Sequence, residues 1–549
     1  MKKVYNESGV LLALWLVAIL LVACYEDKGN YDYHEIDEIK LSFPGNTGTE
    51  DNIKFIQRLG EKLSIHPEVT CRNKENLTYK WERYTDRTEV EILKNTQNLD
   101  LELEYGEGAA LAWKSGGYSL RYTVKDTVSG QTTQKLIHLT VRSITPVGVY
   151  VLHGNADETD MGTIEDDNFV DGMTDGIVTP GYYSSRNEGR RLAGEGCGCC
   201  WFYGDGNPGM LVFTTRDGKY INTTSFHNDM DYETLFEGDV PATALRRLTT
   251  DNNGTVYVYA DDNVYTIDVM YGMEEGESFS PMFSGAEYAQ VKPVPGYFFS
   301  DAGFMDGGLN MGPLAYSVSR SAFVIYNWYA APKPGDIWPL SSCGDDPNGA
   351  VFNPNDMSGQ QLIGMDYGKN TGYGLSQHQW ALLRREKDNS VVVCHFNDEA
   401  YYEDKPTYDM ASTLASDKLH PELLDLNCFQ MSPLTEGVGF FSTPSGVYSL
   451  DVVNGMSDGA NELFTPEGSG ERITKIKLLK FNDNSAVEAT NQVFKSMQGL
   501  CLYVVTWDGV QGRVYALYVD AEGGVDSARG EVKKYEGFKE IKDICFRLQ

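Results

Sequence analysis

The chain has 549 residues, of which 46 are Lys or Arg and 79 are Asp or Glu, so its formal net charge is −33. A field of this sign repels nucleic acid and anionic lipid headgroups, and we expect neither as a partner. Hydrophobic residues make up 41% of the chain and aromatic residues 12%. This composition excludes an intrinsically disordered protein and favours a folded, β-rich chain of several domains.

Residues 1–23 have the pattern of an export signal. Lys2 and Lys3 precede an apolar run from Val10 to Val22, and the small residue Ala23 follows it. As a helix the run reaches about 20 Å, which is short of the ~30 Å hydrocarbon core of a bilayer. The sequence therefore predicts a cleaved signal peptide rather than a permanent transmembrane helix.

Cys24 stands where the apolar run stops, directly after Leu21-Val22-Ala23. This ending resembles a lipobox, the motif at which lipoprotein processing attaches diacylglycerol to the cysteine thiol and cleaves before it. The resemblance implies that Cys24 is the lipid-attachment residue and the first residue of the mature protein. Residues 24–37 would then be a short lipidated tether. A plain secretory signal followed by an unrelated cysteine is the alternative.

The residues after Cys24 indicate which membrane surface is involved. Glu26 and Asp27 form an acidic pair, and Asp27-Lys28-Gly29-Asn30-Tyr31-Asp32-Tyr33 follows. A lipidated cysteine followed by this segment resembles the N-terminus of the PKD-like family lipoproteins of outer-membrane nutrient-uptake systems of the starch-utilisation type. The resemblance implies an outer-membrane location facing the cell exterior, and partnership with an outer-membrane transporter and its accessory lipoproteins. It supplies no catalytic residue.

Residues 38–145 are predicted to form a PKD/immunoglobulin-like β-sandwich. Leu77-Thr78-Tyr79-Lys80-Trp81 alternates and places a Trp in mid-strand, where such a sandwich has its core aromatic residue. Residues 118–124 and 136–141 read as strands that pair across the turn 126–130. His138 lies on the opposite face from Ile137 and Leu139 by strand period, which predicts a surface residue.

Residues 146–549, from Pro146 onward, are predicted to form a β-propeller of about seven blades. An apolar strand runs into a polar turn, and a second apolar strand leaves it, about once every 58 residues. The seven turns lie near Asp157, Asp217-Gly218, Asn253-Gly254, Arg320, Asp388-Asn389, Ser445-Gly446 and Asp508-Gly509. A repeat of this length holds four strands, and closure into a ring would remove exposed sheet edges. Six or eight blades remain open. The fold class is therefore all-β.

Cysteine usage gives no disulfide framework, because nine cysteines besides Cys24 follow irregular spacings. Cys394, Cys501 and Cys545 lie in apolar strand-like runs and are expected to be buried small hydrophobes. The cluster of Cys197, Cys199 and Cys200 in a glycine-rich stretch leaves three alternatives open: a soft-metal site, a redox-labile contact or strained disulfide, and plain packing.

No catalytic motif stands out. The sequence has no Gly-x-Ser-x-Gly elbow, no His-Glu-x-x-His and no phosphate or dinucleotide loop. We predict no metal site, catalytic residue or cofactor. Calcium at the Asp-rich turns 205–207 and 345–349 is an open alternative, although neither turn has the ligand spacing of an EF-hand.

Aromatic residues in a proline-stiffened loop are the strongest binding candidates. The loop 327–339 holds Trp328, Tyr329 and Trp338 together with three prolines. Rigid rings can stack on a sugar or a peptide at low entropic cost. The alternative is that these rings, like those of the weaker candidates Tyr182-Tyr183 and Tyr401-Tyr402, pack against the blade below.

Together these features predict a surface-exposed lipoprotein that acts as a non-catalytic binding or accessory component of a nutrient-uptake system, with a glycan or peptide as its ligand. Its contact with the membrane would be through the lipid anchor only. Two alternatives remain: a propeller lyase or hydrolase acting on glycan or peptide, and a structural scaffold for protein–protein interaction.

Overall fold

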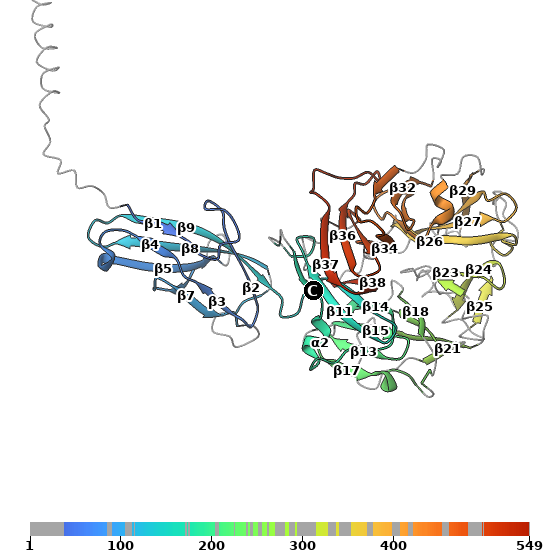
Figure 1. The fold of residues 1–549 in the computed structure, drawn as a ribbon, viewed down its shortest axis with the longest axis horizontal. Coiled ribbons are helices and arrows are strands. Elements are labelled where there is room, and N and C mark those ends of the chain that lie inside the picture. The colour runs from blue at the N-terminus through green and yellow to red at the C-terminus, as the bar shows by residue number, and fades with distance from the viewer. Residues whose placement is uncertain are drawn as a thin grey trace, which may run out of the picture. The chain divides into compact units, whose positions relative to one another are not determined.

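A computed structural model describes residues 38–547 apart from a set of gaps. The gaps are 85–89, 105–111, 115, 171–172, 174–175, 204–207, 224–225, 238–239, 242–244, 251–254, 261–262, 269–279, 285–290, 294–313, 328–335, 340–352, 371–376, 398–406, 415–420, 453–460, 481–496 and 498. The chain divides into two compact units (Figure 1). The first comprises Met1–Phe55, Lys62–Glu102 and Tyr118–Leu139, and the second comprises Ile56–Glu61, Leu103–Gly117 and Thr140–Gln549.

The first unit is an immunoglobulin-like arrangement of short antiparallel strands. Its main sheet has the order β2-β9-β8-β5-β6, and two smaller sheets are formed by β1 with β4 and by β3 with β7. The strands are β1 (Lys40–Ser42), β2 (Ile53–Arg58), β3 (Lys62–Ile65), β4 (Glu68–Thr70), β5 (Leu77–Tyr84), β6 (Val90–Lys94), β7 (Leu99–Glu102), β8 (Gly116–Asp126) and β9 (Thr132–Arg142), with a single turn of 3₁₀ helix, η1 (Lys74–Asn76).

Trp81 is at the centre of the core of this unit, as its mid-strand position predicts. Its side chain is fully buried, and its ring centroid lies 4.3 Å from that of Tyr122 on β8. The indole Nε1 donates a hydrogen bond to the carbonyl of Thr96 at 3.1 Å. On β9, Ile137 and Leu139 are buried while His138 is exposed, so the predicted surface position of this histidine is confirmed.

The second unit is built of antiparallel sheets whose strands follow one another in the sequence. Among the described residues there are seven, which we number in chain order. Sheet 1 contains β10 (Gly148–Gly154), β11 (Glu158–Glu165), β12 (Ile177–Thr179), β13 (Leu192–Ala193) and the last strand, β38 (Glu540–Arg547). Sheet 2 contains β14 (Gly196–Tyr203), β15 (Pro208–Thr214), β16 (Gly218–Asn222) and β17 (Asn228–Asp231). The five-residue helix α2 (Tyr182–Arg186) precedes β13.

The remaining sheets have four strands each. Sheet 3 contains β18 (Leu245–Thr250), β19 (Thr255–Ala260), β20 (Asn263–Asp268) and β21 (Ser280–Ser284). Sheet 4 contains β22 (Val291–Pro293), β23 (Leu314–Ser317), β24 (Ala322–Asn327) and β25 (Asp336–Pro339). Sheet 5 contains β26 (Gln360–Asn370), β27 (Gln377–Arg385), β28 (Val391–Asn397) and β29 (Thr407–Leu414).

Sheets 6 and 7 complete the series. Sheet 6 contains β30 (Cys428–Met431), β31 (Val438–Ser442), β32 (Val447–Asp451) and β33 (Asn461–Phe464). Sheet 7 contains β34 (Arg472–Leu478), β35 (Cys501–Trp507), β36 (Gly512–Tyr518) and β37 (Lys533–Phe538). Single 3₁₀ turns lie at η2 (Tyr232–Thr234) and η5 (Pro421–Asp425). In Figure 1 the sheets succeed one another around a common centre.

The last strand of the chain completes the first sheet of this unit. β38 pairs antiparallel with β10, from Gly148 opposite Arg547 to Gly154 opposite Glu540. Arg547 also donates hydrogen bonds to the hydroxyl of Thr145 and to the carbonyl of Pro146. The beginning and the end of the second unit are therefore joined in one sheet.

Among the described residues, the core of the second unit lies between consecutive sheets. On sheet 1, Val149, Val151 and Ile544 pack against residues of sheet 7, including Tyr503 and Val514. The alternate residues Tyr150, Leu152 and Cys545 pack against sheet 2. Strand side chains alternate between faces, so this sheet is enclosed on both sides. Further clusters join sheets 2 and 3, 4 and 5, 5 and 6, and 6 and 7.

The predicted turns all fall between consecutive strands of these sheets. Six of them connect the second and third strands in the order of their sheet, for example Asp157 between β10 and β11 and Asp508-Gly509 between β35 and β36. The seventh predicted turn, Asn253-Gly254, lies outside the described residues, in the stretch of sequence between β18 and β19.

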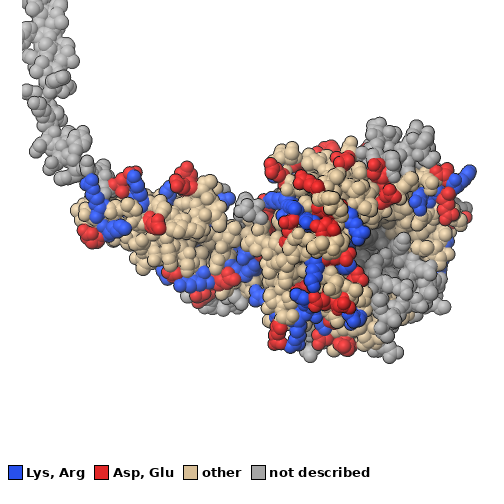
Figure 2. Space-filling view, viewed as in Figure 1, with Lys and Arg blue, Asp and Glu red and all other residues tan. Residues whose placement is uncertain are grey.

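Charged side chains of both signs are interspersed over the described surface, as Figure 2 shows for one face. None of the helices within the described residues has the length and apolar character needed to cross a membrane.

Candidate functional site

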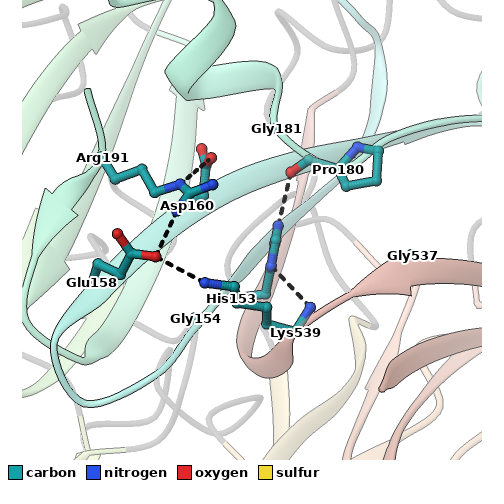
Figure 3. Close-up of a pocket in the computed structure, with 9 residues that line it drawn as sticks. All are labelled: His153, Gly154, Glu158, Asp160, Pro180, Gly181, Arg191, Gly537 and Lys539. Carbon is teal, nitrogen blue, oxygen red and sulfur yellow. Dashed lines mark hydrogen bonds and ion pairs between the residues drawn. The ribbon is translucent and has the colours of Figure 1, made fainter. Parts of the chain in front are cut away.

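A cavity of about 180 Å³ lies in the second unit, where the two ends of that unit meet (Figure 3). Its lining comes from β10, β11, the segments on either side of α2, the end of β37 and the turn that follows it. The nine lining residues are His153, Gly154, Glu158, Asp160, Pro180, Gly181, Arg191, Gly537 and Lys539. The volume is well above the ~10–15 Å³ needed by one water and below the ~300 Å³ at which pockets for drug-sized molecules begin. The cavity is suited to one small group.

His153 forms part of the wall of the cavity, and both of its ring nitrogens are engaged. The backbone N–H of Lys539 donates to Nδ1 at 3.2 Å, and Nε2 lies 2.8 Å from the carbonyl oxygen of Pro180. This pattern assigns the proton to Nε2, which donates to the carbonyl. The side chain is 5% exposed, and burial lowers the pKa of His153. The ring is therefore neutral at neutral pH and holds the turn before β38 against the segment before α2.

Two carboxylates and two cations line the other side of the cavity (Figure 3). Glu158 Oε1 accepts hydrogen bonds from Arg191 Nη1 at 2.5 Å and from Lys539 Nζ at 2.8 Å. The hydrogen bond from Lys539, the attraction of Arg191 and the hydrogen bond from Arg191 lower the pKa of Glu158. Asp160 is 6% exposed and accepts from Arg191 Nε at 3.3 Å. The four charges balance, and three of the side chains remain partly open to solvent.

Asp160 owes its fixed position to α2. Its Oδ2 accepts from the hydroxyl of Ser184 at 2.6 Å, and its Oδ1 accepts from the backbone N–H of Ser184 at 3.1 Å. The carboxylate thus satisfies donors of the short helix, and the helix in turn holds the carboxylate toward Arg191.

Glycine is required at two positions of the lining. A Cβ at Gly154 would lie 2.2 Å from the carbonyl oxygen of Glu158. Gly537 has φ of +108°, a conformation that side chains rarely adopt, and a Cβ there would approach Pro180 to 3.1 Å. Both glycines allow backbone segments to approach closely around the cavity.

The lining offers several hydrogen-bonding groups to a ligand. None of the nine lining residues is a Ser, Thr or Cys that could act as a nucleophile. His153 already uses both nitrogens, so it is not poised to accept a proton from a ligand. The exposed parts of Glu158, Arg191 and Lys539 offer donors and acceptors side by side. No group of three His, Cys, Asp or Glu in the described part of the chain is placed to hold a metal ion.

The site residues predicted from the sequence lie mostly outside the described residues. This holds for Cys24, for Trp328 and Tyr329, and for the Asp-rich turns 205–207 and 345–349. The backbone of Trp338 lies in β25, opposite Ile325 of β24. Its side chain is not among those that the structure describes. Tyr182 and Tyr183 are buried in the core, which confirms packing for this weaker candidate.

The cysteines in apolar runs are buried, as predicted: Cys394, Cys501 and Cys545 are at most 4% exposed. In the cluster on β14, Cys199 and Cys200 are buried, Cys197 is half-buried, and none of the three is in a disulfide. Cys199 packs in the core between sheets 1 and 2, and Cys200 packs in the core between sheets 2 and 3. Successive side chains of this strand therefore pack in two different cores.

Sequence reasoning missed the cavity because its walls are distant along the chain. Lys539 bonds to His153 across 386 positions. No motif joins these residues, since each comes from a different strand end or turn. The sequence offered one indication of such a site, the predicted closure of residues 146–549 into a ring. Ring closure predicts that the two ends of this region meet, but it does not predict which side chains line the contact.

Comparison with known proteins gives one family. The family model described as the PKD-like family matches residues 24–195. The match begins at Cys24, covers the described residues of the first unit and continues through β13 to the residue before β14. It thus supports a PKD-like region at the N-terminal end of an all-β chain. No curated protein matches the chain.

Proposed function

We propose that this protein is a surface-exposed outer-membrane lipoprotein anchored through Cys24. Three observations support this: the apolar run ends at Ala23-Cys24, an acidic pair follows, and the family match begins at Cys24, the first residue of the proposed mature chain. Removal of a signal at 1–23 would leave the tether 24–37 between the membrane and the first unit. The expected partners are an outer-membrane transporter and its accessory lipoproteins.

The second unit is proposed to be a seven-bladed β-propeller. The support is the succession of seven antiparallel sheets among the described residues and the core clusters between consecutive sheets. The pairing of β38 with β10 and the packing of sheet 7 on sheet 1 are what ring closure requires. Closure leaves no open face on the terminal sheets, which would otherwise expose their apolar residues.

The proposed activity is non-catalytic binding of an uncharged, hydroxyl-rich ligand, such as one residue of a glycan, in the cavity beside His153. The single observation behind this is the charge balance of the lining, in which Glu158 lies between Arg191 and Lys539. A hydroxyl group both donates and accepts, so it can pair with the carboxylate and with a cation at once. A charged ligand would gain little from a site of zero net charge and would have to displace an existing pair.

The anchor is tested by Cys24→Ala. We expect this variant to lose acylation and to leave the membrane fraction, as judged by fatty-acid labelling and cell fractionation. Replacing Glu26 and Asp27 by Ala should keep the lipid but remove surface exposure, measured by protease treatment of intact cells. Membrane retention of the Cys24→Ala protein without cleavage of its N-terminus would contradict the lipoprotein assignment.

The binding site is tested by calorimetry of the purified protein against panels of neutral glycans and peptides. Arg191→Ala removes a group that contacts both carboxylates of the cavity, and we expect it to weaken the bound glycan at least tenfold, or about 1.4 kcal/mol. Arg190→Ala is the matched control, because Arg190 is 78% exposed and pairs with Glu188, away from the lining. Its affinity should equal that of the parent protein.

The same assay distinguishes the cavity from the aromatic loop. If the loop 327–339 is the contact surface, Trp328→Ala and Trp338→Ala will weaken the glycan by roughly tenfold and Arg191→Ala will not. Release of a shortened or modified glycan during the titration, detected by mass spectrometry, would favour the lyase or hydrolase alternative. Affinity for peptides alone would contradict the ligand class proposed for the cavity.

A further inference from the structure

Two buried thiols lie in the core between sheets 1 and 2. Cys199 lies on β14 and Cys545 lies on β38, and each is 4% exposed. Both are free cysteines and both belong to the core cluster that the two sheets share. One of them is in the cysteine cluster singled out in the sequence, and the other is four residues from the C-terminus.

Strand alternation identifies these two thiols and excludes their neighbours. On β14 the side chain of Cys199 points into the core with sheet 1, whereas Cys200 packs in the core with sheet 3. On β38 the side chain of Cys545 points toward sheet 2, whereas Ile544 and Phe546 pack against sheet 7. Of these residues, the pair that meets at the interface is therefore Cys199 and Cys545.

A hydrogen bond fixes the two strands relative to each other at this point. The backbone N–H of Cys199 donates to Oδ2 of Asp543 at 3.1 Å. Asp543 is two residues before Cys545, so both side chains leave β38 on the same face. Hydrogen bonding with the Cys545 thiol, together with burial, raises the pKa of Cys199 well above its ordinary value. The hydrogen bond to Asp543 and the shared core cluster place both side chains at this one contact between the sheets.

We propose that Cys199 and Cys545 are a redox-sensitive pair that forms a disulfide linking the C-terminal strand β38 to β14. The oxidant is a second disulfide, either of a small molecule or of a thiol–disulfide oxidoreductase. Each cysteine gives up its thiol proton, one S–S bond forms, and the two electrons and two protons reduce the oxidant to two thiols. This pairing does not depend on where the protein resides or on the ligand proposed above.

The disulfide would act on the element that completes the second unit. β38 is the last strand of the chain, and its pairing with β10 joins the two ends of that unit. A covalent bond to β14 would hold this strand in place and would restrict the unfolded chain over the long segment between residues 199 and 545. Both thiols are buried and Cys199 is protonated at neutral pH, so we expect oxidation to be slow in the folded protein and faster during refolding.

The test uses the purified full chain, both folded and during refolding from denaturant, in buffer with excess oxidised glutathione. Free thiols are trapped with N-ethylmaleimide, and the protein is digested with trypsin without reduction. The expected product is a cross-link between the peptides 192–216 and 543–547. Reduction of the cross-linked protein should lower its thermal midpoint by roughly 5 °C or more.

Three variants assign the sulfurs, because residues 192–216 contain all three clustered cysteines. Cys199→Ala and Cys545→Ala should each abolish the cross-link and the difference in thermal midpoint. Cys200→Ala is the matched control, since its thiol is buried on the opposite face of the same strand, and it should keep both. Recovery of residues 199 and 545 as alkylated thiols in both preparations would overturn the proposal. So would a cross-link that persists in Cys199→Ala.

Discussion

The two units of this protein complete their sheets over very different distances along the chain. In the first unit, β8 and β9 form a hairpin, and the strand pairs that hold Trp81 in the core come from one continuous stretch of about a hundred residues. In the second unit, Arg547 of the last strand bonds to Thr145, 402 positions earlier. A small sandwich can thus form from nearby segments, whereas the second unit is complete only when its final strand is in place.

This difference teaches where each unit is vulnerable. The first unit depends on one compact core around a few large side chains, so a single cavity there is costly. The second unit spreads its core over many inter-sheet clusters, each of which contributes a part. Its weak point is the junction between the first and last sheets, because loss of that junction opens two faces at once.

The most damaging change we predict is removal of β38 by truncation after Lys539. It deletes the strand that pairs with β10. The apolar residues with which sheet 1 packs against sheets 2 and 7 would then be exposed to solvent. We expect the lost packing free energy to exceed the net stability of an ordinary domain, which is about 5–15 kcal/mol. Calorimetry should show no cooperative unfolding of the second unit and an unchanged transition for the first. Deleting only residues 548–549 is the control. Two intact transitions after the larger truncation would contradict our inference that the second unit depends on its last strand.

Trp81→Ala should cause the next largest loss of stability, and it should affect the first unit alone. Removing a fully buried Trp leaves a cavity and deprives the Thr96 carbonyl of a donor, so we expect a loss of about 3–5 kcal/mol in the free energy of unfolding. Urea denaturation of the full chain, followed by proteolysis at each urea concentration, reports each unit separately. Ile92→Ala, at a side chain that is 59% exposed, should change stability by less than about 0.5 kcal/mol.

The smallest effect concerns Asp166, at the junction of sheets 1 and 7. Its carboxylate is fully buried and accepts hydrogen bonds from Tyr535 at 2.9 Å and Tyr503 at 3.2 Å. Burial raises the pKa of Asp166 from 3.8 to about 6. Between these values the native state binds more protons than the unfolded state, so stability falls as the pH rises from about 4 to 6 and is level above that.

Asp166→Asn should remove this slope and stabilise the second unit at pH 7 by at most about 3 kcal/mol, since each pKa unit corresponds to about 1.4 kcal/mol. The measurement is the thermal midpoint of each transition between pH 4 and 8. Asp167→Asn is the neighbouring control, because Asp167 is partly exposed and pairs with Lys533. An unchanged slope in Asp166→Asn, or the same slope in the first unit, would show that this carboxyl group is not responsible.

The sequence predicted the repeating strand–turn–strand pattern well because apolar alternation and polar turns are local signals. It placed Trp81 in the core and His138 on the surface for the same reason, and the structure confirms both, since Trp81 is fully buried and His138 is exposed. It gave no indication of which residues line the cavity, because these share no motif.

By itself, the sequence determined that the chain is all-β, where its strands turn, and that an apolar run ends at a cysteine. These follow from periodicity and composition, which act over a few residues at a time. Only the tertiary structure decided that His153 meets the turn at Lys539, and that Cys199 rather than Cys200 packs in the same core as Cys545. The physical reason is that such contacts depend on which face of a strand meets which neighbouring sheet. Packing between segments that are hundreds of residues apart determines this, and the local spacing of residue types in the sequence does not reveal it.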